Sequence, residues 1–488
     1  MQPTTAPTPA ERLPLVVDLD GTLVRSDMLV ETLVRTVRRS PVELVLLPWR
    51  LARGRAAFKQ AMARDAAVAV GYLPYDTGLL AWLTAERAAG TPLILATAAD
   101  RRIADAIADH LGIFDAVLCS DGRTNLKGAA KRDAIRGSVG DRFRYAGDSA
   151  ADRPVWQAAE GAILVGTSPA LAAAVAREAT VERSFPRPRA SLATWTRALR
   201  VHQWTKNLLL FVPLFTSFGL FRPAGLAVMA LAFLAFSIAA SATYLVNDMW
   251  DLDSDRAHPR KSRRPFASGA IPLTHGIRAA AGGLLLALVL ALAVSPGFAA
   301  MLLVYLALTS SYSLMFKEYV LIDVILLAML YTFRILAGAV AVAVPLTPWL
   351  LAFSMFLFLS LALVKRCAEL VSLGALGRDA THGRDYRVSD LVVLWPFGVA
   401  SAVASAVVFG MFVSQADTRA RYAAPDLLWI VAIGLVYWLA RLWIKTSRDE
   451  MHDDPILYAL RDRGSRIAIG AMVAVTLAAQ WLPLERMP

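Results

Sequence analysis

Residues 244–269, YLVNDMWDLDSDRAHPRKSRRPFASG, join an apolar segment to a group of acidic residues and then to a group of basic residues. Asn247, Asp248, Asp251 and Asp255 follow the pattern N-D-x-x-D-x-x-x-D. At about 100° per residue, aspartates with this spacing lie within an arc of about 60° on a helix. The stretch therefore predicts a row of carboxylates on one helix face at the end of a membrane span.

Such a row requires a cation, because each bare charge near the bilayer core costs roughly 2.5–3.5 kcal/mol on insertion scales. Carboxylate oxygens suit Mg²⁺, which binds through one or two carboxylates together with substrate phosphates. The basic residues that follow the row fit a metal–diphosphate site, and they are Arg260, Lys261, Arg263 and Arg264. The alternative is an acidic helix end that only sets membrane topology.

The aspartate pattern resembles the first aspartate motif of the UbiA-type membrane transferases, and the likeness covers roughly residues 195–488. The polyprenyl-phosphate phosphoribosyltransferase branch is the most similar. The similar segments are RVHQWTKN (200–207), NDMWDLDSDRAHPRKSRRPFASG (247–269), YSLMFK (312–317), FRILAG (333–338) and KRCAEL (365–370). The resemblance implies transfer of 5-phosphoribosyl from phosphoribosyl diphosphate to a polyprenyl phosphate, with Mg²⁺ as cofactor and release of diphosphate.

The same resemblance implies roles for individual residues. Asn247, Asp248, Asp251 and Asp255 would hold Mg²⁺, with Asp248 and Asp251 as the catalytic pair. The implied substrate-binding residues are Lys206, Asn207, Lys261, Arg264, Tyr312, Lys317, Arg334, Lys365 and Arg366. Two alternatives stay open: Lys206 and Lys317 as snorkelling lysines at membrane ends, and Arg334 with the Lys365, Arg366 and Glu369 group as intramembrane structural pairs.

The chain departs from prenyl-diphosphate transferases near the fifth expected span. A second aspartate-rich motif is common there, but this region, KEYVLIDVILLAMLYTFR, has only Glu318 and Asp323 as acids. This difference favours phosphoribosyl transfer. The competing interpretations are an aromatic prenyltransferase whose phosphatase has an unrelated substrate, and a lipid-binding scaffold or transporter with a phosphatase attached. Asp453 and Asp454, in the last cytoplasmic loop, either cap a helix or coordinate.

The N-terminal part predicts a different fold. LPLVVDLDGTLV reads as a buried strand that ends in Asp18 and Asp20, PLILAT as a strand that ends in Thr97, and FRYAGDSAAD as a strand followed by Asp148 and Asp152. Open α/β sheets place their sites at such carboxyl ends. With Lys127 between them, this ordered set resembles the haloacid dehalogenase phosphatases.

That resemblance implies the chemistry of the N-terminal domain. Asp18 would be the nucleophile and a metal ligand, and Asp20 the acid/base. Thr97 and Lys127 would hold the phosphate, with Lys131 as the alternative lysine. Asp148 and Asp152 would be ligands of a second Mg²⁺, because an anionic nucleophile and an anionic substrate need neutralising charge.

The predicted fold class is a multidomain chain: an α/β, Rossmann-like domain with a helical cap, then an all-α membrane domain of about nine transmembrane helices. The predicted parts are a disordered tail (1–12), the phosphatase domain (13–180, cap within 27–90), a linker (181–196) and the membrane domain (197–488). Within the cap, residues 41–59 either pack on the domain or contact the bilayer. The expected spans are 207–221, 224–247, 277–296, 298–316, 320–343, 347–366, 390–413, 427–445 and 465–484.

Composition supports a membrane protein. The net charge of +12 does not indicate nucleic-acid binding, because most basic residues of the second half lie in loops between apolar runs. We therefore predict a multi-pass plasma-membrane protein with the N-terminal domain and both active sites on the cytoplasmic side, since no secretory signal precedes the first strand. Cys119 and Cys367 support neither a disulfide nor a zinc site. Homo-oligomerisation stays open.

Overall fold

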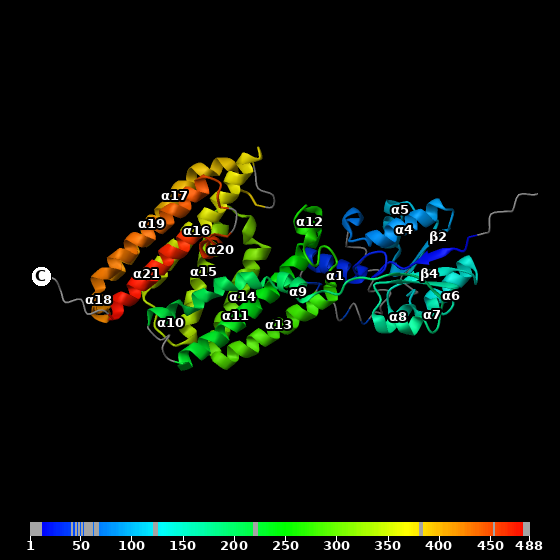
Figure 1. Cartoon of the computed structure of the whole chain (residues 1–488), viewed down its shortest axis with the longest axis horizontal. Coiled ribbons are helices and arrows are strands. Elements are labelled where there is room, and N and C mark those ends of the chain that lie inside the picture. Colours follow the sequence, from blue (N-terminus) through cyan, green and yellow to red (C-terminus); the bar gives the residue numbers. More distant parts are fainter. Residues whose placement is uncertain are drawn as a thin grey trace, which may run out of the picture. The chain divides into compact units, whose positions relative to one another are not determined.

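Figure 1 shows the computed structural model of the chain, which describes residues 12–40, 68–120, 125–217, 223–379, 384–451 and 454–481 and isolated positions between 42 and 62. Residues 1–11 of the expected tail and most of the expected cap segment 41–59 lie outside the described residues. The chain divides into two compact units. The first comprises Met1–Leu199 and Tyr244–Ala281, and the second comprises Arg200–Thr243 and Gly282–Pro488. The aspartate-rich segment therefore belongs to the same unit as the N-terminal domain.

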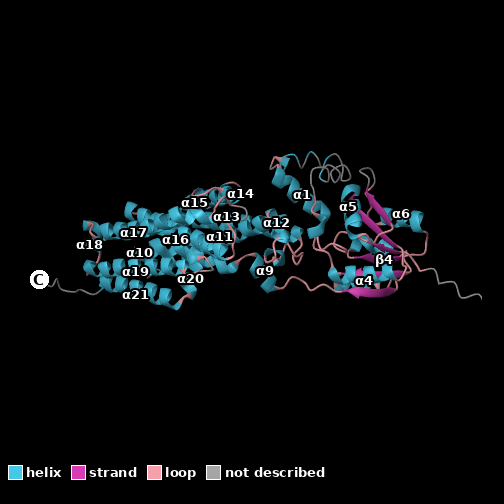
Figure 2. Ribbon diagram, turned by 90° about the horizontal axis from the view of Figure 1, so that it is seen from above, coloured by secondary structure: helices cyan, strands magenta, loops and turns pink. Residues whose placement is uncertain are grey.

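The described residues of the first unit form a six-stranded parallel sheet with the order β3-β2-β1-β4-β5-β6, drawn in magenta in Figure 2. The strands are β1 (Leu15–Val17), β2 (Leu93–Asp100), β3 (Ala116–Ser120), β4 (Arg144–Gly147), β5 (Gly161–Val165) and β6 (Val181–Phe185). β1 pairs with both β2 and β4 and is buried at all three residues, as expected for a parallel strand covered on both faces. β6 pairs with β5, so part of the segment expected as linker belongs to the sheet.

Helices cover both faces of this sheet. Leu15 and Val17 pack in one hydrophobic cluster with Ile107 of α5, whereas Val16 packs in another with Trp156 of α7. This division follows from the alternation of side chains along a strand. The helices are α1 (Met28–Arg39), α4 (Thr77–Ala88), α5 (Arg101–Leu111), α6 (Ala129–Val139), α7 (Arg153–Trp156), α8 (Pro169–Val175), α9 (Leu192–Ala198) and α12 (Leu252–Ala257), with the short 3-10 helices η1 (Val70–Tyr72), η2 (Ala150–Asp152) and η5 (Lys261–Arg263).

The regular secondary structure of the second unit is all helical within its described residues. Its helices are α10 (Val212–Thr216), α14 (Pro296–Leu314), α15 (Ile322–Ala341), α16 (Pro348–Ala375), α17 (Leu391–Val413), α18 (Ala416–Arg421), α19 (Leu428–Ser447), α20 (Pro455–Arg461) and α21 (Arg463–Trp481), with 3-10 helices η3 (Val201–Phe211), η6 (Phe316–Glu318), η7 (Val388–Asp390) and η8 (Pro425–Leu427). α11 (Pro223–Trp250) and α13 (Leu273–Val294) contribute residues to both units.

Seven helices among the described residues are long and apolar enough to cross a membrane: α11, α13, α14, α15, α16, α17 and α19. In the first expected span, 207–221, the described residues 207–217 form the end of the 3-10 helix η3 and the short α10, and residues 218–221 lie outside the described residues. Pro213 in the first turn of α10 has no N–H to donate to the preceding turn, so one continuous α-helix is disfavoured. The last expected span is α21, which has 19 residues and is less apolar than these seven helices.

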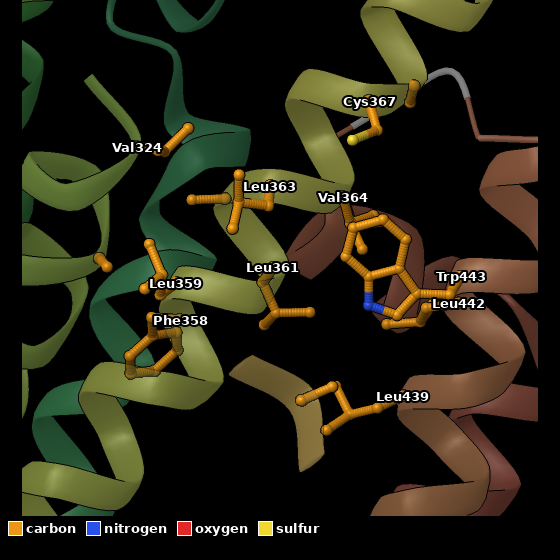
Figure 3. Close-up of a cluster of buried hydrophobic side chains, with 14 of the residues drawn as sticks. Val324, Phe358, Leu359, Leu361, Leu363, Val364, Cys367, Leu439, Leu442 and Trp443 are labelled. Atoms are coloured by element: carbon orange, nitrogen blue, oxygen red, sulfur yellow. The ribbon is translucent and has the colours of Figure 1, made fainter. Parts of the chain in front are cut away.

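The largest hydrophobic cluster of the second unit lies between α15, α16 and α19. Figure 3 shows Leu363 and Leu442 in this cluster, both with no exposed surface. Trp443 donates its indole N–H to Ser360 Oγ at 3.1 Å. The middle of α16, from Phe358 to Leu370, is thus mostly buried, and it positions Lys365 and Arg366.

Candidate functional site

The first candidate site lies at the carboxyl ends of β1 and β4. Asp18 follows β1, and its backbone N–H donates to Ala146 O of β4 at 3.0 Å. Asp148 directly follows β4, and Asp152 lies in η2. Since parallel neighbours end at the same edge of the sheet, the carboxylates converge, and one oxygen of each of the three lies within 4.8 Å of the others. Within the described part of the chain, Asp18, Asp148 and Asp152 thus form a group of three carboxylates whose spacing suits a metal ion.

Lys131 provides a positive charge in this group. Its ammonium donates to Asp18 Oδ1 at 2.8 Å and to Tyr145 Oη at 3.1 Å, and it lies 3.6 Å from Asp152 Oδ1. Lys127 lines the same cavity, but among the described residues it is Lys131 that bonds to Asp18. The sequence analysis assigned the phosphate lysine to Lys127 and kept Lys131 as the alternative. The geometry favours Lys131 as the lysine beside Asp18.

The electrostatics of the group fit a divalent cation. Burial, followed by the carboxylates of Asp18 and Asp152, raises the pKa of Asp148 to about 8. Burial also raises the pKa of Asp18 to about 6, although Lys131 lowers it. One ammonium among three carboxylates leaves excess negative charge. Oxygen ligands at this spacing suit Mg²⁺, which would relieve that repulsion.

Two other predicted residues have different positions. Asp20 lines the cavity, and its Oδ1 accepts the backbone N–H of Met28 at 2.8 Å. Thr97 has no exposed surface, and its hydroxyl accepts the Ala99 N–H at 3.0 Å. At this strand the cavity is lined by residues 98–100. The role of Thr97 as a phosphate ligand stays a prediction.

Arg187 is a site residue that the sequence analysis did not identify. It follows β6, and its guanidinium donates to the carbonyls of Gly21 and Thr22 at 2.5 and 2.6 Å and to Asp76 Oδ2 at 2.7 Å. These contacts fix the turn that follows Asp20. The sequence signal was only an arginine in a proline-rich segment, which does not predict such a contact.

The aspartate row is not on one unbroken helix. α11 ends at Trp250, and Asp251 is the N-cap of α12. Helical hydrogen bonds nevertheless continue from Asp251 N to Asn247 O and from Asp255 N to Asp251 O, each at 2.9 Å.

Arg264 holds two carboxylates of this row together. One Nη lies 3.2 Å from Asp248 Oδ1 and 2.7 Å from Asp255 Oδ2, and both carboxylates are almost fully buried. A cation thus occupies the position between them, as expected if these carboxylates need a positive partner. Lys261 lies in η5 on the same loop.

In the second unit, basic residues gather around Asp454, the N-cap of α20. Asp454 Oδ2 lies 2.7 Å from Lys206 Nζ and 3.5 Å from Lys365 Nζ, and it accepts the Tyr331 hydroxyl at 3.3 Å. Burial raises the pKa of Asp454, but Lys206 and Lys365 outweigh it and bring the pKa to about 2. Asp454 both caps a helix and holds two predicted substrate-binding lysines. Asp453 lies outside the described residues.

Arg334 is buried inside α15 and connects several helices. Its Nε donates to Asn207 Oδ1 at 3.0 Å, one Nη donates to Tyr305 Oη at 2.8 Å, and the other donates to Leu330 O at 2.6 Å. Asn207 in turn donates to Ser237 Oγ at 3.0 Å. Arg334 and Asn207, both predicted to bind substrate, are therefore hydrogen-bonded to each other.

Arg366 belongs to a separate buried group. It pairs with Asp323 and Glu369, and the Tyr386 hydroxyl also donates to Asp323. The Arg366–Glu369 pair belongs to the alternative of intramembrane structural pairs that the sequence analysis left open, whereas Asp323 was not part of that alternative. Tyr312 lies near the end of α14 and Lys317 in η6.

Comparison with known proteins places these sites in two families. The UbiA prenyltransferase family model matches residues 208–461, and the haloacid dehalogenase-like hydrolase model matches residues 15–157. An uncharacterized protein of Sinorhizobium fredii is 40% identical over 468 residues, which are 95% of this chain and 90% of that protein. A decaprenyl-phosphate phosphoribosyltransferase of Mycobacterium tuberculosis is 32% identical over 299 residues, 58% of this chain and 93% of that protein. The solved structure of a UbiA homologue from Archaeoglobus fulgidus bound to GPP and Mg²⁺ matches 59% of this chain and 99% of that chain, with 19% identity and a TM-score of 0.45.

These matches confirm the predicted fold class, an α/β haloacid dehalogenase-like domain followed by a helical integral membrane domain. The UbiA match covers more than half of the chain, and the Sinorhizobium protein matches almost all of it. The chain therefore belongs to the UbiA prenyltransferase family and carries a haloacid dehalogenase-like domain on the N-terminal side of its UbiA domain.

Proposed function

We propose that the membrane domain transfers 5-phosphoribosyl from phosphoribosyl diphosphate to a polyprenyl phosphate. The observation that carries the proposal is the 32% identity with a decaprenyl-phosphate phosphoribosyltransferase over 93% of that protein's length. In this reaction a phosphate oxygen of the lipid bonds to C1 of the ribose. The bond from C1 to the diphosphate oxygen breaks, and the diphosphate leaves with the electron pair.

Asn247, Asp248, Asp251 and Asp255 are the proposed Mg²⁺ ligands of the transferase. The position of Arg264 between Asp248 and Asp255 supports this assignment, because it demonstrates a local need for positive charge. When bound, Mg²⁺ supplies charge stabilisation to the departing diphosphate. Lys261 and Arg264 are proposed to bind that diphosphate directly.

The proposed phosphate-binding residues of the second unit are Lys206, Asn207, Tyr312, Lys317, Arg334, Lys365 and Arg366. The two ammonium groups held by Asp454 support this role for Lys206 and Lys365, since lysines held at one acid can turn to a substrate phosphate. Asp323, one of the two acids in the region where a second aspartate motif is common, is fully buried and paired with Arg366. This pairing supports phosphoribosyl diphosphate as the donor, because that donor needs no second carboxylate cluster in this region.

The N-terminal domain is proposed to remove the 5-phosphate from the lipid product. A carboxylate oxygen of Asp18 attacks phosphorus, and the bond to the ribose 5-oxygen breaks. Asp20 protonates the leaving oxygen and then assists the water that hydrolyses the aspartyl phosphate. Lys131 or Lys127 holds the phosphate oxygens. Both sites are proposed to face the cytoplasm, which the basic loops between spans support.

The test is mass spectrometry of lipids after incubating the full chain with Mg²⁺, phosphoribosyl diphosphate and a polyprenyl phosphate. Wild type should yield the ribosyl lipid without the 5-phosphate, and Asp18→Asn should stop at the phosphorylated lipid. Asp248→Ala should yield neither product, whereas the control Asp426→Asn, an exposed acid, should match wild type. Parallel incubation with a prenyl diphosphate and an aromatic acceptor tests the alternative: a prenylated aromatic product would replace the proposed reaction.

A further inference from the structure

The cavity of the phosphatase site is larger than a phosphate group requires. Its volume is about 880 Å³, within the range of cavities that enclose drug-sized ligands. Asp18, Asp20 and Asp148 line one part of it. Much of the remaining wall comes from residues beyond the haloacid dehalogenase match, which ends at residue 157: residues 187–190, Trp195, residues 269–270 and residues 272–275. All of these residues belong to the first unit.

Gly269 begins the wall segment 269–275 and brings it against the turn that follows Asp20. Its φ of +69° favours glycine, and a Cβ at this position would lie 2.7 Å from Arg25 Cβ and 2.8 Å from Arg25 O. Arg25 lies five residues after Asp20, on the turn that Arg187 also holds. The wall is therefore packed directly onto the loop that carries the catalytic acids.

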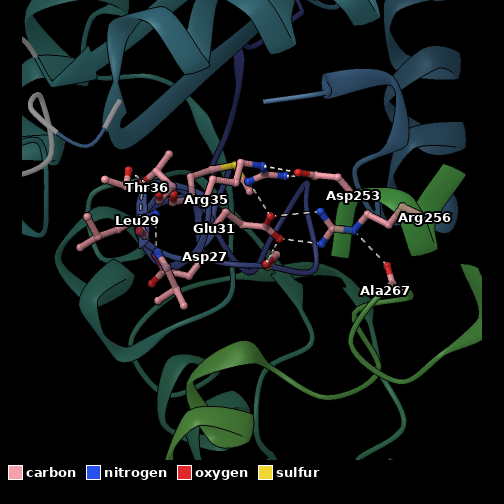
Figure 4. Close-up of polar contacts among 12 residues, drawn as sticks. Asp27, Leu29, Glu31, Arg35, Thr36, Asp253, Arg256 and Ala267 are labelled. Atoms are coloured by element: carbon pink, nitrogen blue, oxygen red, sulfur yellow. Dashed lines mark hydrogen bonds and ion pairs between the residues drawn. The ribbon is translucent and has the colours of Figure 1, made fainter. Parts of the chain in front are cut away.

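Ion pairs join α1 to α12, and a hydrogen bond continues from α12 to Ala267, two residues before the wall segment, as Figure 4 shows. Glu31 has no exposed surface and accepts from Arg256 at 2.6 and 3.1 Å, while Arg256 Nε donates to Ala267 O at 3.2 Å. Arg35 pairs with Glu31 at 2.8 Å and with Asp253 at 2.6 Å. Breaking a buried pair of this kind is strongly unfavourable, so the wall is a fixed part of the phosphatase site.

The wall also contains the beginning of a membrane helix. Residues 273–275 form the first turn of α13, which is long and apolar enough to cross a membrane. The start of this helix therefore forms one side of the cavity, at the depth where the helix enters the membrane. A phosphate carried on a lipid head group stays at this depth, whereas a small soluble ester gains nothing from such a wall.

We propose that residues 269–275 of the transferase domain form the substrate-recognition wall of the phosphatase, and that this wall selects phosphomonoesters carried on a lipid head group. Thr274 and His275 are the specificity-determining residues, since both line the cavity and offer a hydroxyl and an imidazole to the part of the head group next to the lipid. The inference rests on the phosphatase half of the proposed function and does not require the transferase reaction.

The test supplies two probes directly to the full chain in lipid nanodiscs with Mg²⁺: synthetic farnesyl-phosphoryl-ribose 5-phosphate and free ribose 5-phosphate. Wild type should prefer the lipid-linked probe in kcat/KM. Thr274→Val and His275→Ala should each lower kcat/KM for the lipid-linked probe about tenfold, mainly through KM, and lower kcat/KM for ribose 5-phosphate by a much smaller factor, so that the preference for the lipid-linked probe falls. Arg278→Ala is the matched control, because it lies on the same helix outside the cavity wall.

Equal hydrolysis of both probes by wild type would overturn the inference, as would wall variants that lower both activities equally. Failure of the proposed transferase reaction is separate, since it would appear as absence of lipid product from phosphoribosyl diphosphate while the probe preference persists.

Discussion

Lys131→Met is expected to remove most of the phosphatase activity, and Lys127→Met to remove much less. Lys131 Nζ lies 2.8 Å from Asp18 Oδ1 and 3.6 Å from Asp152 Oδ1, and its side chain is 4% exposed. Lys127 only lines the cavity. Both lysines lie near the start of α6, and each variant removes one positive charge there. Comparing the two variants therefore separates the effect of the ammonium position from the effect of losing a positive charge.

The magnitude follows from the distance. Two unit charges 2.8 Å apart interact by about 6 kcal/mol at an effective dielectric constant of about 20. Much of this interaction is already present before the reaction, and a single preorganised group is worth about 3–4 kcal/mol in the transition state. We therefore expect kcat/KM of Lys131→Met to fall by about 10²–10³-fold.

The assay is release of inorganic phosphate by the full chain in detergent, with thermal unfolding of each variant as the control for folding. Asp133→Asn, an exposed acid on the same helix, serves as the unaffected control. The reasoning would be refuted if a folded Lys131→Met retained near wild-type activity, or if Lys127→Met lost as much.

Three further changes test other parts of the structure. Glu31→Ala leaves Arg256 buried without its partner and should lower the free energy of unfolding by about 3–5 kcal/mol, measured by thermal or denaturant unfolding in detergent; an unchanged transition would contradict the buried pair. Gly269→Ala should cost about 1–2 kcal/mol for its positive φ alone, and crowding against Arg25 should also lower phosphatase activity; a fully active and stable variant would exclude the close approach. Asp251→Asn should reduce lipid product at least about 10²-fold while hydrolysis of added ribose 5-phosphate is unchanged, and loss of both activities would point to misfolding instead.

Residues at strand ends are predictable from the sequence. The buried runs before Asp18 and before Asp148 identify parallel strands, and the carboxyl ends of neighbouring parallel strands meet at one edge. Hydrophobic pattern and sheet geometry thus place both acids at one edge of the sheet. Their close approach also requires that β1 and β4 be neighbours, which the strand order of the structure shows.

The choice between Lys127 and Lys131 depends on where a helix begins. α6 starts at Ala129, after Gly128 with a φ of +62°, and this start directs Lys131 into the core. A sequence pattern fixes helix ends only to within about 2–4 residues, which is comparable to the spacing between Lys127 and Lys131.

The contacts of Asp454 illustrate a different limit. Its partner Lys206 is 248 residues away, and no local pattern relates the two. The sequence analysis could assign helix capping to Asp454, and the structure retains that cap. The lysine contacts depend on how η3, α16 and α20 pack, which residue spacing within one helix does not determine.

The boundary between the two compact units does not coincide with the boundary between the two family matches. Family matches separate residues 15–157 from residues 208–461, yet Tyr244–Ala281 belongs to the unit that contains the phosphatase sheet. A phosphatase cut after residue 199 would keep Asp18, Asp148 and Lys131, but it would lose Arg256 from the buried pair with Glu31 and the cavity wall that begins at Gly269. Glu31 would then keep Arg35 but lose Arg256, one of its two buried cationic partners, so the isolated domain should be both less stable and less selective than the same domain in the full chain.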